Sequence, residues 1–169
     1  EAMEELGVET GIVTRSTNDN YAVDCTIETD QLALIPDSYI DLTAEKIRIY
    51  KELDSTGNEK DLEIMRGKLT DRFGKLPVEL ERLFDIVRIR QLGVKLGFEK
   101  IIIKNGVMIA FFISNPLSQY YKSDRFSKVL ENVSIHHQLF EIKQPDNRLR
   151  IVVRNVDSIS KAYEILKKL

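Results

Sequence analysis

The sequence is poor in the residues from which most catalytic and metal sites are built. It has one cysteine, two histidines and no tryptophan among its 169 residues. The single cysteine, Cys25, cannot close an internal disulfide, and the longest fully apolar run, from Val107 to Ile113, is far too short to cross a bilayer. These absences argue against secreted and membrane proteins, so we expect a cytoplasmic protein with no membrane partner.

The remaining composition is that of an ordinary globular domain, with 43% hydrophobic and 31% charged residues. The net charge of −2 conceals an asymmetry. Residues 1–60 carry 5 bases and 14 acids (5 − 14 = −9), whereas residues 61–169 carry 20 bases and 13 acids (20 − 13 = +7). Because acids are interleaved with the bases, no concentrated basic stripe typical of a dedicated nucleic-acid binder is present. The first residue is Glu1 rather than methionine, from which we expect a chain cut from a longer parent.

The first half of the chain is predicted to be mainly helical. Residues 1–20 are interpreted as the end of a preceding helix plus a polar linker, and residues 21–169 as a single domain. Tyr21, Val23, Cys25 and Ile27 alternate with polar residues, which predicts a half-buried strand over 21–29. Three helices then follow. The first runs from an Asp41 N-cap to Leu53, the second from an Asn58 N-cap to a stop at Gly74, and the third from Pro77 to a stop at Gly97.

After Gly97 the hydrophobic period changes from that of helices to that of strands. Asn105-Gly106 between two apolar runs predicts a hairpin, because both residues tolerate a positive φ. We expect a helix over 117–132, a second hairpin joining 138–143 to 148–154, and a closing helix over 156–169. The fold class is therefore α+β: an N-terminal strand and three-helix region followed by a ββαββα half with antiparallel hairpins.

No catalytic or cofactor constellation can be assembled from the sequence. His136 and His137 are adjacent, so on an extended segment they point to opposite sides and cannot chelate one ion. Cys25 fits a buried thiol better than a nucleophile. Gly67-Lys68-Leu69-Thr70 resembles the end of a phosphate-binding loop, but it lacks the upstream glycine and the preceding strand. We therefore predict no enzyme activity and no cofactor in this domain; a hydrolase is the weakest of three hypotheses.

A small nucleic-acid-binding module is the alternative function. The third helix and first hairpin contain several bases, and Tyr120-Tyr121-Lys122 follows, so an aromatic and basic sheet could bind single strands. The interpretation that competes with it is a solvated face with i,i+3 ion pairs such as Glu79–Arg82 and Asp85–Arg88. The bases concerned are Arg82, Arg88, Arg90, Lys95, Lys100 and Lys104.

Three motifs in order resemble the C-terminal domain of transcription-repair coupling factor, the Mfd family. They are LALIPDSYI at 32–40, RIYK at 48–51 and LTDRFGKLP at 69–77. The likeness covers roughly residues 24–104, and from Val107 onward only the order of elements agrees. The resemblance implies a non-catalytic, autoinhibitory domain. It follows an ATP- and Mg-dependent double-stranded-DNA translocase that displaces stalled RNA polymerase and recruits nucleotide excision repair. The domain would dock on the N-terminal UvrB-like module of the same chain and mask the surface that UvrA needs.

The resemblance places the docking surface at the end of the second helix, on Asp71 and Arg72. Helical periodicity independently turns Asp71 outward, because it lies about 200° from the inward Leu69. A carboxylate in the last turn opposes the helix dipole, so we expect it to be offset by a partner or a neighbour. Lys68 stands where the family tends to have an acid, and it could pair with Asp71 at i,i+3.

Overall fold

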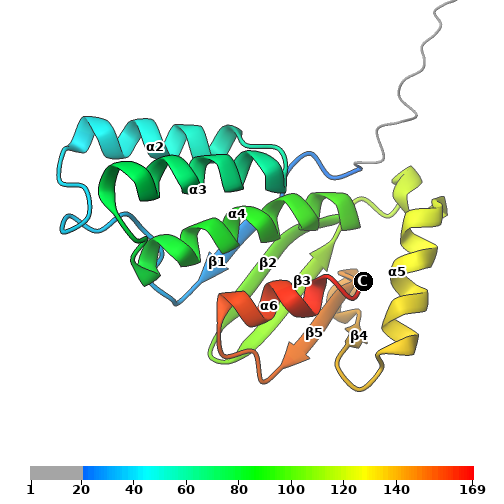
Figure 1. Ribbon diagram of the computed structural model, residues 1–169. Helices are drawn as coiled ribbons and strands as arrows, with labels where there is room; N and C mark the ends of the chain where they lie inside the picture. Colours follow the sequence, from blue (N-terminus) through cyan, green and yellow to red (C-terminus); the bar gives the residue numbers. More distant parts are fainter. Residues whose placement is uncertain (1–20) are drawn as a thin grey trace, which may run out of the picture.

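The computed structural model describes residues 21–169, so the helix end and linker predicted for 1–20 lie outside the described residues. The described chain is a mixed α+β fold, which confirms the predicted fold class (Figure 1). Its elements in order are β1 (Thr26–Thr29), α2 (Thr43–Ser55), α3 (Glu59–Phe73), α4 (Val78–Leu96), β2 (Phe98–Lys104), β3 (Val107–Phe112), η1 (Gln119–Lys122), α5 (Asp124–Ile135), β4 (Glu141–Lys143), η2 (Pro145–Asn147), β5 (Arg150–Arg154) and α6 (Ile159–Leu166).

The sheet has five strands in the order β1-β2-β3-β5-β4. The hairpin pairs β2–β3 and β4–β5 are antiparallel, as predicted, and β3 also pairs with β5. In contrast, β1 pairs in parallel with β2, although α2, α3 and α4 lie between the two strands in the sequence. The periodicity of the sequence could not indicate this long-range pairing. The Asn105-Gly106 turn has φ of 53° and 74°, confirming the hairpin prediction.

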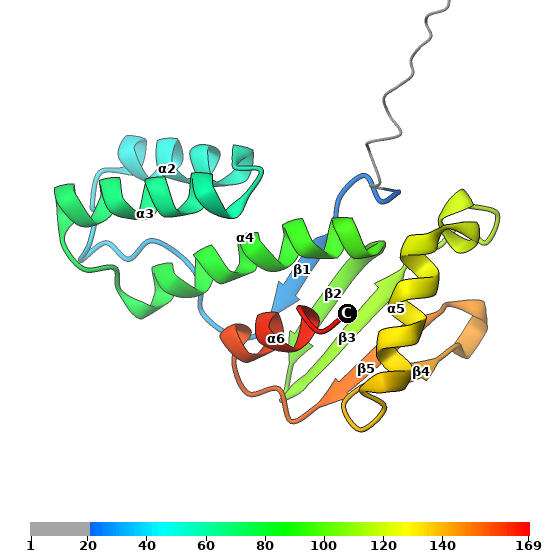
Figure 2. The ribbon, with the colours of Figure 1, turned by 45° about the vertical axis from the view of Figure 1, so that its right-hand side comes forward.

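Helix α4 joins two hydrophobic cores. Its first half packs Leu80, Phe84 and Val87 against α2 and α3, and its second half packs Ile89 and Leu96 against the sheet. In Figures 1 and 2, α2 and α3 lie side by side away from the sheet, while α4, α5 and α6 lie over one sheet face. None of the helices within 21–169 is long and apolar enough to span a bilayer.

Several predicted boundaries were wrong. The strand expected over 21–29 comprises only Thr26–Thr29, and Val23, which was expected to face inward, is fully exposed. Asp41 is not a cap: α2 starts after Leu42, whose side chain cannot cap it. The helix expected over 117–132 is divided into η1 and α5, because Ser123 caps a new helix by accepting from the backbone N–H of Phe126.

The ends of α3 and α4 agree with the sequence. The side chain of Asn58 accepts a hydrogen bond from the backbone N–H of Asp61 at 2.9 Å, which starts α3. Gly74 and Gly97 end their helices with φ of 91° and 96°, a region that favours glycine. Pro77 precedes the first residue of α4.

Candidate functional site

The three residues predicted to form a docking surface all lie on the last two turns of α3. Lys68, Asp71 and Arg72 are exposed, whereas Leu69 between them is only 5% exposed. This division follows from the helical period, because Leu62, Met65 and Leu69 recur at steps of three and four and face the core. The outward orientation expected for Asp71 is therefore present in the fold.

These residues share one shallow depression between α2 and α3, with a volume of about 310 Å³. Its floor is apolar, formed by the buried side chains of Ile49, Met65 and Leu69. Its rim is charged, formed by Arg48, Glu52, Lys68, Asp71 and Arg72. A second depression of about 240 Å³ continues along the same helix pair and shares Glu52, Met65 and Lys68 with the first. We call the two together the α2–α3 groove.

Arg72 is tied to α2 by an ion pair that the sequence did not reveal. Its guanidinium donates to Glu45 Oε2 at 3.1 Å and lies 4.7 Å from the centre of the Phe73 ring. Glu45 also accepts from Arg48, and that hydrogen bond is the main reason why the pKa of Glu45 lies below its usual value. The partners are 27 residues apart. Only the antiparallel packing of the two helices brings them together.

Lys68 and Asp71 remain without internal partners. The i,i+3 ion pair that their spacing allows does not form, and neither residue has an oppositely charged group within 4.0 Å anywhere in residues 21–169. The charges on this part of the rim thus face solvent. Arg72 is the basic residue in the last turn of α3, where a cation is favourable for the helix dipole, whereas Asp71 itself forms no ion pair with the described chain.

The family-like segment at 32–40 holds the end of α3 in place, a role that the motif alone did not indicate. Tyr39 donates its hydroxyl proton toward the backbone oxygens of Leu69 at 3.2 Å and Gly74 at 2.7 Å. These are carbonyls near the end of the helix, where intrahelical donors run out. The Tyr39 ring also packs on Phe73, with centroids 5.7 Å apart. The segment therefore fixes the turn that carries Asp71 and Arg72.

The residues considered for catalysis do not form a reactive site. Cys25 is fully buried, and burial raises the pKa of its thiol to about 12. Gly67 to Thr70 lies inside α3, so its resemblance to a phosphate-binding loop is false. His136 and His137 stand in the turn after α5 rather than on the extended segment expected. Within residues 21–169, no group of three or more His, Cys, Asp or Glu side chains could hold a metal ion.

The bases considered for nucleic-acid binding are largely engaged within the fold. Arg88 donates to Glu59 at 2.8 Å, Asp85 at 2.9 Å and Glu63 at 3.0 Å, which includes the predicted Asp85–Arg88 pair. Arg82 donates instead to the backbone oxygen of Leu32, so the predicted Glu79–Arg82 pair is wrong. Tyr120 is fully buried and cannot stack on a base. Arg90 forms an ion pair with Asp54, whereas Lys100 and Lys104 both pair with Glu28.

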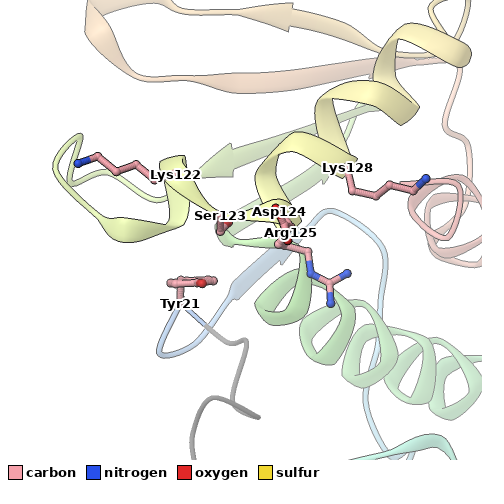
Figure 3. A pocket seen from close by; sticks show the side chains of 6 residues that line it. All are labelled: Tyr21, Lys122, Ser123, Asp124, Arg125 and Lys128. Carbon is pink, nitrogen blue, oxygen red and sulfur yellow. The ribbon is translucent and has the colours of Figure 1, made fainter.

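A separate basic depression of about 510 Å³ lies at the start of α5 (Figure 3). It is lined by Tyr21, Lys122, Ser123, Asp124, Arg125 and Lys128. The lysine side chains extend toward opposite ends, with Arg125 between them, so the three cations do not converge on one point. Of these three cations, only Lys122 was a candidate from the sequence, because Ser123-Asp124 and Phe126-Ser127 interrupt the run of bases.

Comparisons with known proteins agree with the motifs. A family model described as the TRCF domain matches residues 29–123. Transcription-repair-coupling factor of Rickettsia conorii is 34% identical over 133 residues, which cover 78% of this chain and 11% of that protein. The Rickettsia prowazekii protein is 36% identical over 124 residues, covering 73% and 10%. The chain thus spans about a tenth of the length of the curated relatives it matches.

A solved structure supports the fold separately. The crystal structure of the C-terminal domain of transcription-repair coupling factor superposes with a TM-score of 0.70 at 21% identity, covering 86% of each chain. The family match includes α2, α3, α4 and the β2–β3 hairpin, and so it contains the whole α2–α3 groove. The family match and the curated relatives show that the chain belongs to the TRCF domain family and is a domain of transcription-repair coupling factor.

Proposed function

We propose that this chain is a non-catalytic, autoinhibitory docking domain of its parent protein. The parent would be an ATP-dependent double-stranded-DNA translocase that displaces stalled RNA polymerase and recruits nucleotide excision repair. In the resting state the domain would bind the N-terminal UvrB-like module of the same protein and so cover the surface that UvrA needs. ATP and Mg would be bound by the motor, not by this domain.

The observation that supports this proposal most directly is the α2–α3 groove. Lys68, Asp71 and Arg72 are exposed on the rim of one depression whose floor is apolar. An apolar centre surrounded by polar groups is the usual anatomy of a protein–protein interface. Of these three residues, Lys68 and Asp71 have no ion-pair partner among residues 21–169, which leaves them available for complementary charges on another surface.

A contact of this kind needs little energy to act as a lock. When two surfaces belong to one protein, the closed state is favoured by the difference between their contact energy and the cost of restraining the linker. A net bias of about 3 kcal/mol keeps more than roughly 99% of molecules closed. A small groove with a few well-placed charges can supply a difference of that size, and UvrA binding can still overcome it.

Charge reversal in the full-length parent tests the proposal. We expect Asp71→Lys combined with Arg72→Glu to raise the affinity for UvrA and the basal ATPase rate, because the restraint is weakened. The matched control reverses the exposed α6 pair, Glu164→Lys with Lys167→Glu, whose nitrogen and oxygen are 3.2 Å apart. The control should leave both quantities unchanged. Unaltered UvrA affinity and ATPase rate in the Asp71/Arg72 variant would contradict the docking role.

A nucleic-acid-binding module is the second candidate, and the basic depression beside α5 is the observation that favours it. Lys122, Arg125 and Lys128 are spread along a line, as suits an extended phosphate backbone. A mobility shift of the isolated domain with single- or double-stranded DNA that weakens steeply with salt would support this function. Titrations that stay flat at low salt would remove it.

A further inference from the structure

The second face of the sheet presents three ordered rows of side chains. Cross-strand register places Lys100 opposite Phe111 and Phe111 opposite Arg150, so these three form the first row. Two residues further along each strand the middle row is aliphatic, and two residues beyond that the third row is basic again. The middle row is Ile102, Ile109 and Val152, and the third row is Lys104, Val107 and Arg154. Edge strand β4 adds Lys143 to the first row and Glu141 to the middle row.

This face is left uncovered by the helices of residues 21–169. Figures 1 and 2 show α4, α5 and α6 on the opposite side. On the central strands β2, β3 and β5, the alternate residues that face the covered side are at most 1% exposed; they are Ile101, Ile103, Met108, Ala110, Ile151 and Val153. By contrast Ile102, Ile109 and Val107 on the open side remain partly exposed, even though they occupy central strands. Val152, at the other end of the middle row, is 7% exposed, so Ile102 and Ile109 supply most of the accessible aliphatic surface. We call this surface the open sheet face.

The open sheet face is positive although the whole chain has a net charge of −2. The three rows and the edge strands β1 and β4 together contribute five bases and the two acids Glu28 and Glu141 to this face, so the local balance is 5 − 2 = +3. Each acid is shared by two bases. Glu28 lies 3.0 Å from Lys100 and 3.6 Å from Lys104, and Glu141 lies 3.4 Å from Arg154 and 3.9 Å from Lys143.

The spacing of the rows matches the width of a helix. The two basic rows are four residues apart along each strand, which is about 13 Å. A helix with its side chains is about 10–12 Å across, so its two flanks would reach the two basic rows. The aliphatic middle row crosses three strands, about 10 Å, which equals roughly two helical turns.

We propose that the open sheet face docks an amphipathic helix of another protein segment, with a narrow apolar stripe flanked on both sides by Asp and Glu. The stripe lies along Ile102, Ile109 and Val152, across the strands. The flanking carboxylates meet Lys100 and Arg150 on one side and Lys104 and Arg154 on the other. This surface is distinct from the α2–α3 groove, because it lies on the sheet core rather than on the core of α2 and α3.

Two other occupants fit less well. Single-stranded nucleic acid needs a free aromatic platform. The aromatic residue of this face, Phe111, is already covered by the guanidiniums of Arg150 at 4.6 Å and Arg148 at 5.2 Å. A second copy of the chain would bring two faces of charge +3 together, which like-charge repulsion opposes.

The test uses the whole 169-residue chain and a labelled probe peptide. The probe is a fluorescein-labelled synthetic helix of four heptads with Leu at positions a and d and Glu at positions e and g. Glu at both flanking positions discourages self-association of the probe. Two matched peptides replace the flanking Glu by Gln or by Lys. We expect anisotropy to report binding of the Glu peptide, weaker binding of the Gln peptide and none of the Lys peptide.

Protein variants separate this face from general electrostatic attraction. Lys104→Glu with Arg154→Glu should weaken binding by at least about tenfold at low salt, because two rim contacts become repulsive. The control Lys60→Glu with Lys161→Glu changes the net charge equally at exposed positions of α3 and α6 and should leave binding within about twofold. Ile109→Thr keeps a β-branched residue in the strand and should also weaken binding, since it makes the stripe contact polar. Circular dichroism and urea midpoints verify that each variant folds.

Several results would overturn the proposal. One is no binding of the Glu peptide at 100 μM probe with wild-type chain. Another is an equal loss of binding in the Lys60/Lys161 control, which would show non-specific electrostatic attraction. A third is full binding by the Ile109→Thr variant, which removes the aliphatic stripe from the interaction. Tight binding of fluorescein-labelled (dT)12 that depends on Lys104 and Arg154, with no peptide binding, assigns the face to nucleic acid. Sedimentation as a dimer that Lys104→Glu with Arg154→Glu dissolves assigns it to a second copy.

Discussion

The contact between α4 and Cys25, the residue that precedes β1, gives a sharp test of packing. Gly93 is buried in α4, and a Cβ atom added there would lie 2.7 Å from Cys25 Sγ and 3.3 Å from Ile101 Cδ1. Ordinary carbon contacts are about 3.5–4.0 Å, so Gly93→Ala would force α4 and Cys25 apart by roughly 1 Å. Overpacking of a core costs about 1–3 kcal/mol, and the better helix propensity of alanine returns about 1 kcal/mol. We expect a net loss of about 1–2 kcal/mol in the free energy of unfolding.

The matched control for this prediction is Gly67→Ala in α3, where no atom lies within 4 Å of the added Cβ. There only the propensity gain applies, so the variant should be more stable than wild type by about 0.5–1 kcal/mol. Urea denaturation followed by circular dichroism measures both variants. Cys25→Ala should partly rescue Gly93→Ala, with a coupling energy of about 1 kcal/mol in the double-mutant cycle. Equal stabilisation by the two alanines, or additive effects of Gly93→Ala and Cys25→Ala, would refute the packing argument.

Two further predictions concern ionisable groups. Arg88→Met should destabilise the chain by about 2 kcal/mol at pH 7, because it leaves the partly buried Asp85 without its cation. Burial raises the pKa of Asp85 and Arg88 opposes that rise, whereas the hydrogen bond from Arg88 lowers the pKa of Glu59. Protonation of either carboxyl removes part of the unpaired charge that Arg88→Met leaves behind. The loss of stability should therefore shrink as the pH falls below about 5, and it should also be smaller in an Asp85→Asn background. Cys25, whose thiol pKa is raised to about 12, should react with Ellman's reagent only at the rate of unfolding, and rapid labelling of the native chain would contradict its burial.

Local chemistry was sufficient to predict the ends of α3 and α4 and the first hairpin. Asn58, Gly74 and Gly97 act through their own backbone conformation, and Asn105-Gly106 acts through the turn that it forms. The exposure of Asp71 was predictable for the same reason, since the period of one helix determines it.

The failures occurred where a distant partner decides the structure. Residues 21–25 alternate like a strand, but β2 pairs with only four residues of β1, beginning at Thr26 opposite Lys100. Tyr120 sits in η1 rather than in a long helix, and its ring fits against Gly97, where an added Cβ would lie 2.2 Å from the ring. The partner of Arg72, Glu45, is on another helix 27 residues away. The periodicity of a single segment cannot predict these long-range contacts.

Among the helices of residues 21–169, only α4 contributes buried residues to both cores, and so it connects the two proposed docking surfaces. The α2–α3 groove lies on a core completed by Leu80, Phe84 and Val87, and the open sheet face lies on a core completed by Ile89 and Leu96 of the same helix. The Arg88 guanidinium binds Glu59 and Glu63 of α3 from the middle of α4, between the two sets of core residues. Loosening α3 can reach the sheet by moving α4, or by moving the segment after β1 that places Ile35 and Ile40 in the core of α2 and α3. Since α4 is also wedged against Cys25 at Gly93, such movement costs core packing, and the two surfaces are expected to bind their partners independently.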